Sequence, residues 1–289
     1  FSVGGMYYVN DDSLEGDVYC SATGDDDANH GRSAASPKAS LQVLLESYDL
    51  EPGDVVYVES GTYLLEDAVT IDASDGGAPE KPVTIRGPNP PGHVVFSCAN
   101  ADTDVFVLRA SDLNLQRLRL LGGRAGISVT KSGFRFRITE CILEGQAAFG
   151  VYVEEAGGTL ENNIIIGAPY GVLSLLQANV TLVGNTLWQN QYSVTLDGYT
   201  TSTPRVQLRH NILSPVNGGR CFFILRAGAQ IPASDFNCFD ITDGGTICED
   251  WESGRTAGTL TDWQTATGLD LHSISVDPLF ANPASGDFH

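Results

Sequence analysis

An arginine-rich stretch is the first group of residues in this sequence with the means to do chemistry. Seven of the 16 basic residues fall within 29 positions, where the only acid is Asp112. They are Arg109, Arg117, Arg119, Arg124, Lys131, Arg135 and Arg137. Arginine suits bidentate recognition of carboxylate or sulfate groups. Five residues are therefore candidates for binding an acidic polysaccharide in a basic groove: Arg117, Arg119, Lys131, Arg135 and Arg137.

An alternative interpretation gives the same arginines a structural task. Acids about one repeat away in the sequence, such as Glu140, Glu144 and Glu161, could pair with them. Exposed pairs of this kind contribute little energy and leave no free cation for a ligand. If every arginine is paired with an acid, the groove hypothesis fails.

Lyase or epimerase chemistry on uronates needs a base and a group that stabilises the developing negative charge. The candidates are Arg137 and the dipeptide Arg209-His210, although His210 also fits an exposed turn. Glycoside hydrolysis instead needs two carboxylates on either side of the bond. Glu154 and Glu155 are adjacent on a strand and so point to opposite faces, which disfavours a hydrolase.

An acidic segment near the start offers oxygen ligands. The stretch "VNDDSLEGDVYCSATGDDDANHG" has seven acids and no basic residue before Arg32. A loop of this kind could hold Ca²⁺ through Asp25, Asp26, Asp27 and Asn29, or could simply be solvated. It lacks the spacing of an EF-hand, and no cofactor is required by any other motif.

The six cysteines show no zinc-ligand spacing. An even count is compatible with disulfides and export. Cys238 and Cys248, which flank "FDITDGGTI", are the pair we expect to be bonded. Cys141 instead fits a buried thiol.

These residues must be positioned by a repeated structure. Short β segments recur at steps of 22 to 26 residues, separated by Gly or Asn turns and without helical periodicity. Such a period predicts a solenoid, and the absence of leucine-rich spacing favours a parallel β-helix. The aligned columns are Leu115, Ile138, Leu160, Leu182, Leu208, Ser234; Leu120, Leu143, Ile165, Leu187, Leu213, Phe239; and Ile127, Val151, Val172, Val194.

An asparagine returns between the first two columns, at Asn163, Asn185, Asn211 and Asn237. Asparagine tolerates the left-handed or bridge conformation of a sharp corner, and its amide can bond to the coils above and below. We expect a buried, hydrogen-bonded ladder that has a structural rather than a catalytic role.

The flanks complete one predicted domain, residues 1–289. Residues 1–50 comprise a strand, the acidic loop and a helix over 39–48 with Leu41, Leu44, Leu45 and Tyr48 on one face. We expect this helix to cap the first coil. Coils follow over 51–245, and 246–289 holds a short helix or turn and the last strands. We expect the chain to be part of a longer protein.

Composition narrows the partners. The net charge of −20 would repel nucleic acid and anionic membranes, and no apolar run is long enough to span a bilayer. The acidity and the even cysteine count are compatible with an exported, extracellular protein. Its partners would be polysaccharide or other surface modules.

Two flanking segments carry a resemblance to a known family. "YYVNDDS…GDDDANHGRSAASPKASLQVLL…PGDVVYVESGTY" resembles the entry segment of right-handed parallel β-helix repeat proteins, and "LTDWQTATGLDLHSISVDPLFANPASGDFH" resembles their exit segment. In such relatives one loop usually reads Asn-Asp-Gly, whereas here it is Asn29-His30-Gly31.

The resemblance implies the pectate-lyase-like superfamily and a secreted or cell-surface protein of bacterial origin. This superfamily includes polysaccharide lyases, epimerases, polygalacturonases, pectin methylesterases, phage tailspikes and non-catalytic surface or adhesin modules, so the fold alone does not select a function. The two hypotheses are a structural or adhesin-like surface module with polysaccharide contacts, and a lyase or epimerase acting on uronate-containing glycans.

Overall fold

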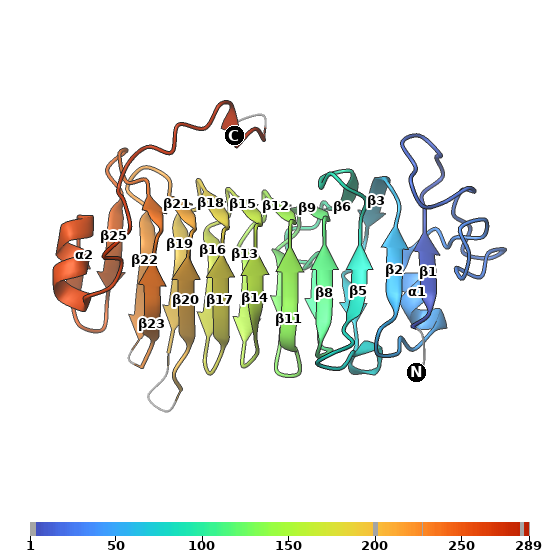
Figure 1. Ribbon diagram of the computed structural model, residues 1–289, viewed down its shortest axis with the longest axis horizontal. Coiled ribbons are helices and arrows are strands. Elements are labelled where there is room, and N and C mark those ends of the chain that lie inside the picture. The colour runs from blue at the N-terminus through green and yellow to red at the C-terminus, as the bar shows by residue number, and fades with distance from the viewer. Residues whose placement is uncertain (1–3, 199–201, 227, 284–285, 289) are drawn as a thin grey trace.

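The chain forms a parallel β-helix, as the repeats predict (Figure 1). The computed structural model describes residues 4–198, 202–226, 228–283 and 286–288. Three sheets, here named A, B and C, run along the molecule and pair strands from successive coils. Within the described residues, strands of successive coils pair in parallel, and an antiparallel strand pair joins β25 to β26 at the C-terminal end.

Each coil contributes one strand to each sheet, in the order A, B, C along the chain. Sheet A contains β1 (Met6–Val9), β2 (Val55–Val58), β5 (Val83–Arg86), β8 (Leu113–Gln116), β11 (Phe134–Thr139), β14 (Gly157–Glu161), β17 (Asn179–Val183), β20 (Arg205–Arg209) and β23 (Gln230–Asp235). Sheet B contains β3 (Gly61–Leu65), β6 (Val94–Cys98), β9 (Arg119–Gly122), β12 (Ile142–Glu144), β15 (Ile164–Ile166), β18 (Thr186–Trp188), β21 (Ile212–Ser214) and β24 (Cys238–Phe239). Sheet C contains β4 (Val69–Ile71), β7 (Phe106–Leu108), β10 (Ala125–Val129), β13 (Phe149–Glu154), β16 (Tyr170–Leu175), β19 (Tyr192–Asp197), β22 (Arg220–Arg226), β25 (Thr246–Asp250) and β26 (Arg255–Ala257).

The predicted columns form the core in the predicted register. Leu160 pairs with Ile138 and Leu182 in sheet A, and Val151 pairs with Ile127 and Val172 in sheet C. All six of these side chains are fully buried. Side chains alternate in and out along each strand, so an inward aliphatic residue in every coil produces a continuous apolar interior.

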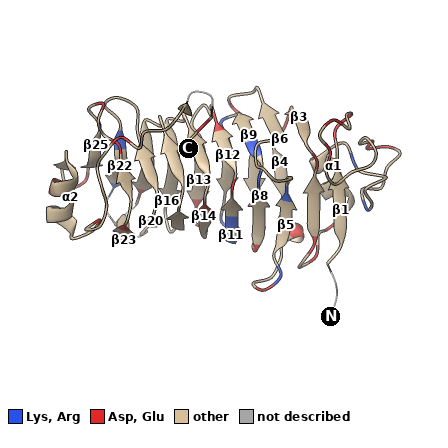
Figure 2. Ribbon diagram, turned by 45° about the horizontal axis from the view of Figure 1, so that its top comes forward, with Lys and Arg blue, Asp and Glu red and all other residues tan. Residues whose placement is uncertain are grey.

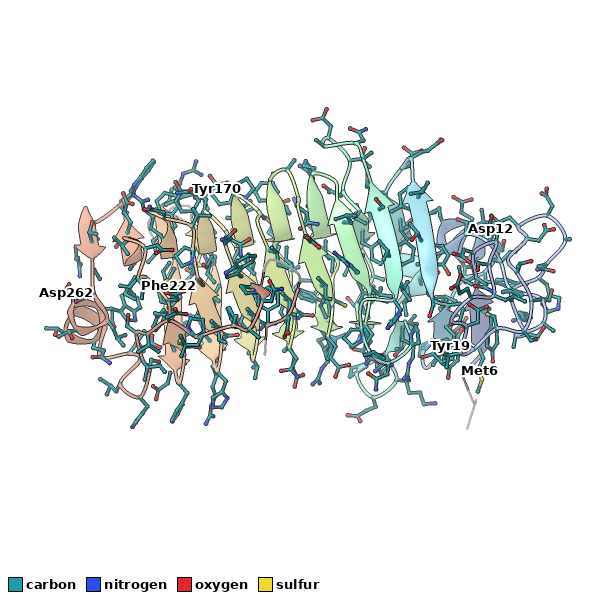
Figure 3. The ribbon with its side chains drawn as sticks, turned by 90° about the horizontal axis from the view of Figure 1, so that it is seen from above. Met6, Asp12, Tyr19, Tyr170, Phe222 and Asp262 are labelled. Carbon is teal, nitrogen blue, oxygen red and sulfur yellow. The ribbon has the colours of Figure 1, made fainter. Side chains whose placement is uncertain are left out.

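Two helices lie at the ends of the solenoid. Helix α1 (Leu41–Ser47) begins at the N-cap Ser40, and its Leu41, Leu44 and Leu45 are buried in the core, as the predicted helix required. Helix α2 (Leu260–Thr267) lies at the opposite end, where Figure 3 labels Asp262. A short 3₁₀ turn, η1 (Ala73–Asp75), follows β4. Among the described residues, neither α-helix has the length and apolar character needed to cross a membrane.

The asparagine ladder is confirmed at the corner between sheets A and B. The backbone N–H of Asn163 donates to Asn185 Oδ1 at 3.0 Å, that of Asn185 donates to Asn211 Oδ1 at 2.9 Å, and that of Asn211 donates to Asn237 Oδ1 at 2.9 Å. Each of the four side chains is 1% exposed. The ladder therefore satisfies backbone groups that the strands cannot reach.

One detail of the corner differs from the prediction. The left-handed residue is not the ladder asparagine but the one before it: Asn162, Gly184, His210 and Phe236 have φ between 54° and 67°. The ladder asparagine can then turn its amide inward, because the preceding residue makes the sharp bend. At three of these positions, Asn162, His210 and Phe236, the preceding residue has an exposed side chain.

The ladder ends on a buried acid. Asn237 Nδ2 donates to Asp270 Oδ1 at 2.9 Å, and Trp263 of α2 donates to Asp270 Oδ2 through its indole N–H at 2.9 Å. Asp270 is 1% exposed and also accepts the Ser273 hydroxyl. The C-terminal helix is thus joined to the last rung by hydrogen bonds to one carboxylate.

Replacing Trp263 by phenylalanine is expected to lower the free energy of unfolding by about 1.5 kcal/mol, since a hydrogen bond to a buried charged group is lost. Urea unfolding measures the change. Trp251→Phe is the matched control, because Trp251 is 63% exposed and its loss should change stability by less than about 0.5 kcal/mol. Equal losses in the two variants would contradict the role assigned to Trp263.

Candidate functional site

The predicted basic strip is divided among different faces of the β-helix (Figure 2). Arg119 lies on β9 in sheet B, Arg137 lies on β11 in sheet A, and Arg117 occupies the corner between these sheets with a φ of 56°. Sheets A and B face different directions around the coil. The expectation of a continuous strip is therefore wrong, because residues two positions apart fall on different sides of a sharp turn.

Each basic residue of this segment is also paired with an acid. The pairs Arg117–Glu140, Arg119–Glu144 and Arg137–Glu161 are those of the alternative interpretation. A free cationic surface is therefore not formed, and the hypothesis of a groove for acidic polysaccharide is corrected. The seven pairs are Arg109–Asp72 (3.2 Å), Arg117–Glu140 (3.4 Å), Arg119–Glu144 (2.5 Å), Arg124–Asp104 (2.7 Å), Lys131–Glu155 (3.5 Å), Arg135–Asp112 (2.6 Å) and Arg137–Glu161.

The Arg135–Asp112 pair has the most complete geometry near sheet A. Arg135 Nε donates to Asp112 Oδ1 at 2.7 Å and its Nη2 donates to Oδ2 at 2.6 Å. The Asp112 side chain is 5% exposed, whereas that of Arg135 is 58% exposed. The hydrogen bond with Asp112 raises the pKa of Arg135 further, so the guanidinium stays charged and in place.

A hollow of about 700 Å³ lies on the outer face of sheet A, beside this pair. Its base is a row of outward side chains in register on four neighbouring strands: Asn114, Arg137, Thr159 and Thr181. Neighbouring strands in a sheet are about 4.8 Å apart, so the row presents one polar group per coil at this spacing. We call this hollow the sheet A groove.

The rim of the sheet A groove adds aromatic and amide groups. Phe134 is 46% exposed and Gln177 and Asn179 stand on the same side of the groove. Within the described residues, the side chains of Asn114, Gln177 and Asn179 make no hydrogen bond to another protein group. These amides are free to bond to a ligand, each with donors and an acceptor.

Two glycines of β14, Gly157 and Gly158, line the middle of the groove. A Cβ on Gly158 would lie 2.3 Å from the backbone oxygen of Phe136, and one on Gly157 would lie 3.1 Å from that of Asn179. Phe136 is fully buried and pairs with Gly158 across β11 and β14. Packing of that ring therefore requires the absence of a side chain at 158.

Arg209 and His210 do not line the sheet A groove; they lie at the corner between sheets A and B, where β20 ends. The guanidinium carbon of Arg209 is 5.2 Å from the ring centre of Phe236, and the His210 ring centre is 5.5 Å from it. His272 also stacks on Phe236, with ring centres 5.0 Å apart and planes 9° apart. Both histidines are exposed. His210 is thus an exposed turn residue.

The sequence analysis missed Phe236 and His272 in this cluster. Phe236 directly precedes Asn237, as His210 precedes Asn211, so the ladder spacing itself identifies it. Asp235 Oδ2 lies 2.7 Å from His272 Nδ1 and accepts a hydrogen bond from it when that nitrogen carries its proton. Burial alone would raise the pKa of Asp235, but the hydrogen bonds from His272 and Phe236 outweigh it and lower the pKa.

The candidate calcium ligands serve the acidic loop itself. Asp25 Oδ1 accepts the backbone N–H groups of Asp27 and Ala28, and Asp26 Oδ1 accepts those of Ala39 and Ser40. Asn29 donates to the carbonyls of Thr23 and Pro37. Across residues 4–198, 202–226, 228–283 and 286–288, no three or more His, Cys, Asp or Glu side chains gather to hold a metal ion.

The predicted disulfide is wrong. Cys238 lies on β24 of sheet B, and Cys248 lies on β25 of sheet C, where it pairs with Phe222. All six cysteines are free thiols, and the Cys238 thiol donates to the carbonyl of Val276 at 3.5 Å. Burial raises the pKa of the Cys248 thiol to about 12. Flanking a short loop in sequence did not bring the two sulfurs together, because that loop passes from one sheet to another.

Comparison with known families matches the model described as the right-handed beta helix region to residues 99–253, more than half of the chain. The chain belongs to this right-handed β-helix family. Comparison with curated protein sequences gives no match.

Solved structures agree with the right-handed β-helix assignment. Pectate lyase Pel9A superposes with a TM-score of 0.62 at 13% identity, over 96% of this chain and 78% of its own. A rhamnogalacturonan lyase gives 0.60 at 15% identity, over 82% and 68%. Pectin methylesterase PemA from Erwinia chrysanthemi gives 0.55 at 9% identity, over 96% and 90%. Identities this low show the fold alone.

The outer face of sheet C in this right-handed β-helix protein carries a row of aromatic rings. Tyr170, labelled in Figure 3, stacks on Tyr192 with ring centres 5.2 Å apart, and Tyr192 stacks on Phe223 at 4.3 Å. The rings cover one another's faces along the helix axis, so their flat sides are used within the protein. We therefore interpret the row as a contact between coils and not as a platform for a ligand.

Proposed function

We propose that this right-handed β-helix protein is a non-catalytic extracellular or cell-surface module that binds a polysaccharide along sheet A. The observation that carries the proposal is the sheet A groove, where a polar side chain recurs in register on four successive strands. A polymer of sugar units lying along the β-helix axis would meet a similar set of groups at each coil.

The groups in the groove match the chemistry of sugars. Amides such as those of Asn114 and Asn179 both donate and accept hydrogen bonds, as sugar hydroxyls do. The exposed ring of Phe134 offers an apolar face to the C–H side of a sugar. The groove is open and long, which suits a chain better than a small molecule buried on all sides.

The fold is one that holds sugar chains in other proteins. A pectin methylesterase solved in complex with a hexasaccharide superposes with a TM-score of 0.54 at 9% identity, over 100% of this chain and 98% of its own. This likeness supports a polysaccharide as the class of ligand and does not transfer an activity.

The lyase or epimerase hypothesis is less well supported by the same geometry. Arg137, its candidate base, is ion-paired with Glu161 and so is already engaged within the protein. Arg209 and His210 both contact Phe236 at the corner between sheets A and B. Neither residue lines the sheet A groove with Arg137.

Binding to a polysaccharide array followed by calorimetry tests the proposal. Thr159→Met, which fills the groove and removes a hydroxyl, is expected to weaken binding at least about tenfold. Thr186→Met is the matched control, because Thr186 points outward from sheet B, in register with Ile164 and Ile212. Equal affinities of the two variants would contradict the groove. Unsaturated uronate formed from pectate, alginate or chondroitin sulfate with Ca²⁺, and abolished by Arg137→Ala, would contradict the non-catalytic assignment.

A further inference from the structure

We infer that the sheet A groove selects neutral glycans and excludes polymers that carry uronate or sulfate groups. The inference rests on the proposed function and specifies its ligand class. It follows from the charges at the groove, which are paired within the protein before any ligand arrives.

Three charged side chains line the sheet A groove: Asp112, Arg135 and Arg137. Arg135 is held by both carboxylate oxygens of Asp112, and Arg137 is held by Glu161 on the neighbouring strand β14. Two positive and two negative charges therefore cancel over a short distance. An anionic polymer would find no excess of positive charge at this face.

Recruiting either arginine to an anionic ligand would leave a carboxylate behind. If Arg135 turned to a ligand, Asp112 would remain as an almost fully buried carboxylate without its partner, which is strongly unfavourable. If Arg137 turned away, Glu161, whose side chain is 27% exposed, would face the incoming ligand carboxylates. Like charges at this distance repel, so both routes oppose uronate binding.

The rest of the molecule adds to the discrimination. Its net charge of −20 repels a polyanion at distances up to the screening length, which is about 10 Å at 0.1 M salt. A neutral glycan is not repelled. The neutral glycan gains hydrogen bonds from the amide and hydroxyl side chains, which carry no charge. The paired arginines add to these bonds, because their remaining N–H groups can still donate to sugar hydroxyls.

Matched polymers separate the two ligand classes. Polygalacturonate and the same polymer after carboxyl reduction share a backbone and differ in having a charged carboxylate or a neutral hydroxymethyl group on each sugar, and xyloglucan, galactomannan and arabinan extend the neutral set. We expect one or more neutral polymers to bind the wild-type protein with an affinity that is unchanged between about 50 and about 500 mM NaCl. Polygalacturonate should not bind.

A charge variant makes the test sharper. Glu161→Gln leaves Arg137 without a compensating charge, and is expected to give measurable, salt-sensitive binding of polygalacturonate where the wild-type protein shows none. Glu252→Gln changes the net charge equally at an exposed turn remote from sheet A and should leave binding as in the wild type.

The outcomes distinguish the two levels of the proposal. Tight, salt-sensitive binding of polygalacturonate to the wild-type groove, lost in Thr159→Met, would overturn the ligand class and leave the proposed function standing. Equal behaviour of Glu161→Gln and Glu252→Gln would overturn the role of charge pairing. Failure of every neutral and acidic polymer to bind would overturn the proposed function and the inference with it.

Discussion

Replacing Asn185 by alanine is expected to lower the free energy of unfolding by roughly 3 kcal/mol, because several buried groups lose their partners at once. The Asn185 amide donates to the carbonyl of Leu160 at 2.9 Å and to Asn211 Oδ1 at 3.0 Å. Its Oδ1 accepts the backbone N–H of Asn163 at 3.0 Å and the Asn163 amide at 2.9 Å. Alanine supplies none of these bonds, and water does not reach a residue that is 1% exposed.

Denaturant unfolding followed by circular dichroism measures this loss. Asn179→Ala is the matched control, since the same amide is removed from an exposed position on β17 without a hydrogen bond in the described structure. A loss below about 1 kcal/mol for Asn185→Ala would show that the ladder does not stabilise the coil. Because the ladder lies inside the solenoid, glycan binding by the folded variant should match that of the wild type.

Gly158→Ala is expected to be the second severe change, with a loss of about 2–3 kcal/mol from overpacking. The new Cβ would lie 2.3 Å from the backbone oxygen of Phe136 and 2.5 Å from its ring. Neither atom can move freely, because Phe136 is 1% exposed and its strand is paired on both sides. The effect is one of packing, since the backbone of Gly158 does not have a positive φ.

The neighbouring glycine provides the control for this prediction. Gly157→Ala places its Cβ 3.1 Å from the carbonyl oxygen of Asn179, which a shift of a few tenths of an ångström can relieve. We expect it to cost less than about 1 kcal/mol. Thermal unfolding of both variants measures the difference, and similar melting temperatures would show that Phe136 repacks and that the groove is deformable at this point.

The fold could be predicted because individual residues that every coil needs recur along the sequence. An inward aliphatic side chain and a buried asparagine recur at nearly constant spacing, and each must satisfy the same physical requirement in every coil. The register Leu160–Leu182–Leu208 follows directly from that spacing. The helix over 41–47 was also predictable, because its buried leucines follow the helical period.

The site was less predictable because its chemistry depends on where long side chains end. The positions of Arg119 and Arg137 in the sequence did not reveal that a sharp corner separates their faces. Spacing allowed Arg137 either to remain free or to reach Glu161, and the paired arrangement is the one found. The sheet A groove also depends on Phe134, Gln177 and Asn179, which share no motif and meet only because the turns before β11 and β17 both border the groove.

The disulfide was mispredicted for a related physical reason. Cys238 and Cys248 are ten positions apart, a separation that two strands joined by a tight hairpin would bring together. In a β-helix the chain instead moves on to another sheet, so residues that are near in sequence diverge and residues one coil apart come together. In this fold, two residues are close in space when they occupy equivalent positions in neighbouring coils.

The left-handed position before the ladder displays one side chain per coil at a regular spacing along the β-helix. Six successive coils hold this position at nearly the same backbone angle, yet the side chains there differ completely in charge and size. The coil thus accepts side chains of different kinds at this position, at a fixed spacing of about 4.8 Å that is set by the distance between strands. A binding or catalytic site built there by substitution would therefore consist of side chains in a regular row along the helix axis, and the core would not have to be redesigned. The six positions are Arg117, Glu140, Asn162, Gly184, His210 and Phe236.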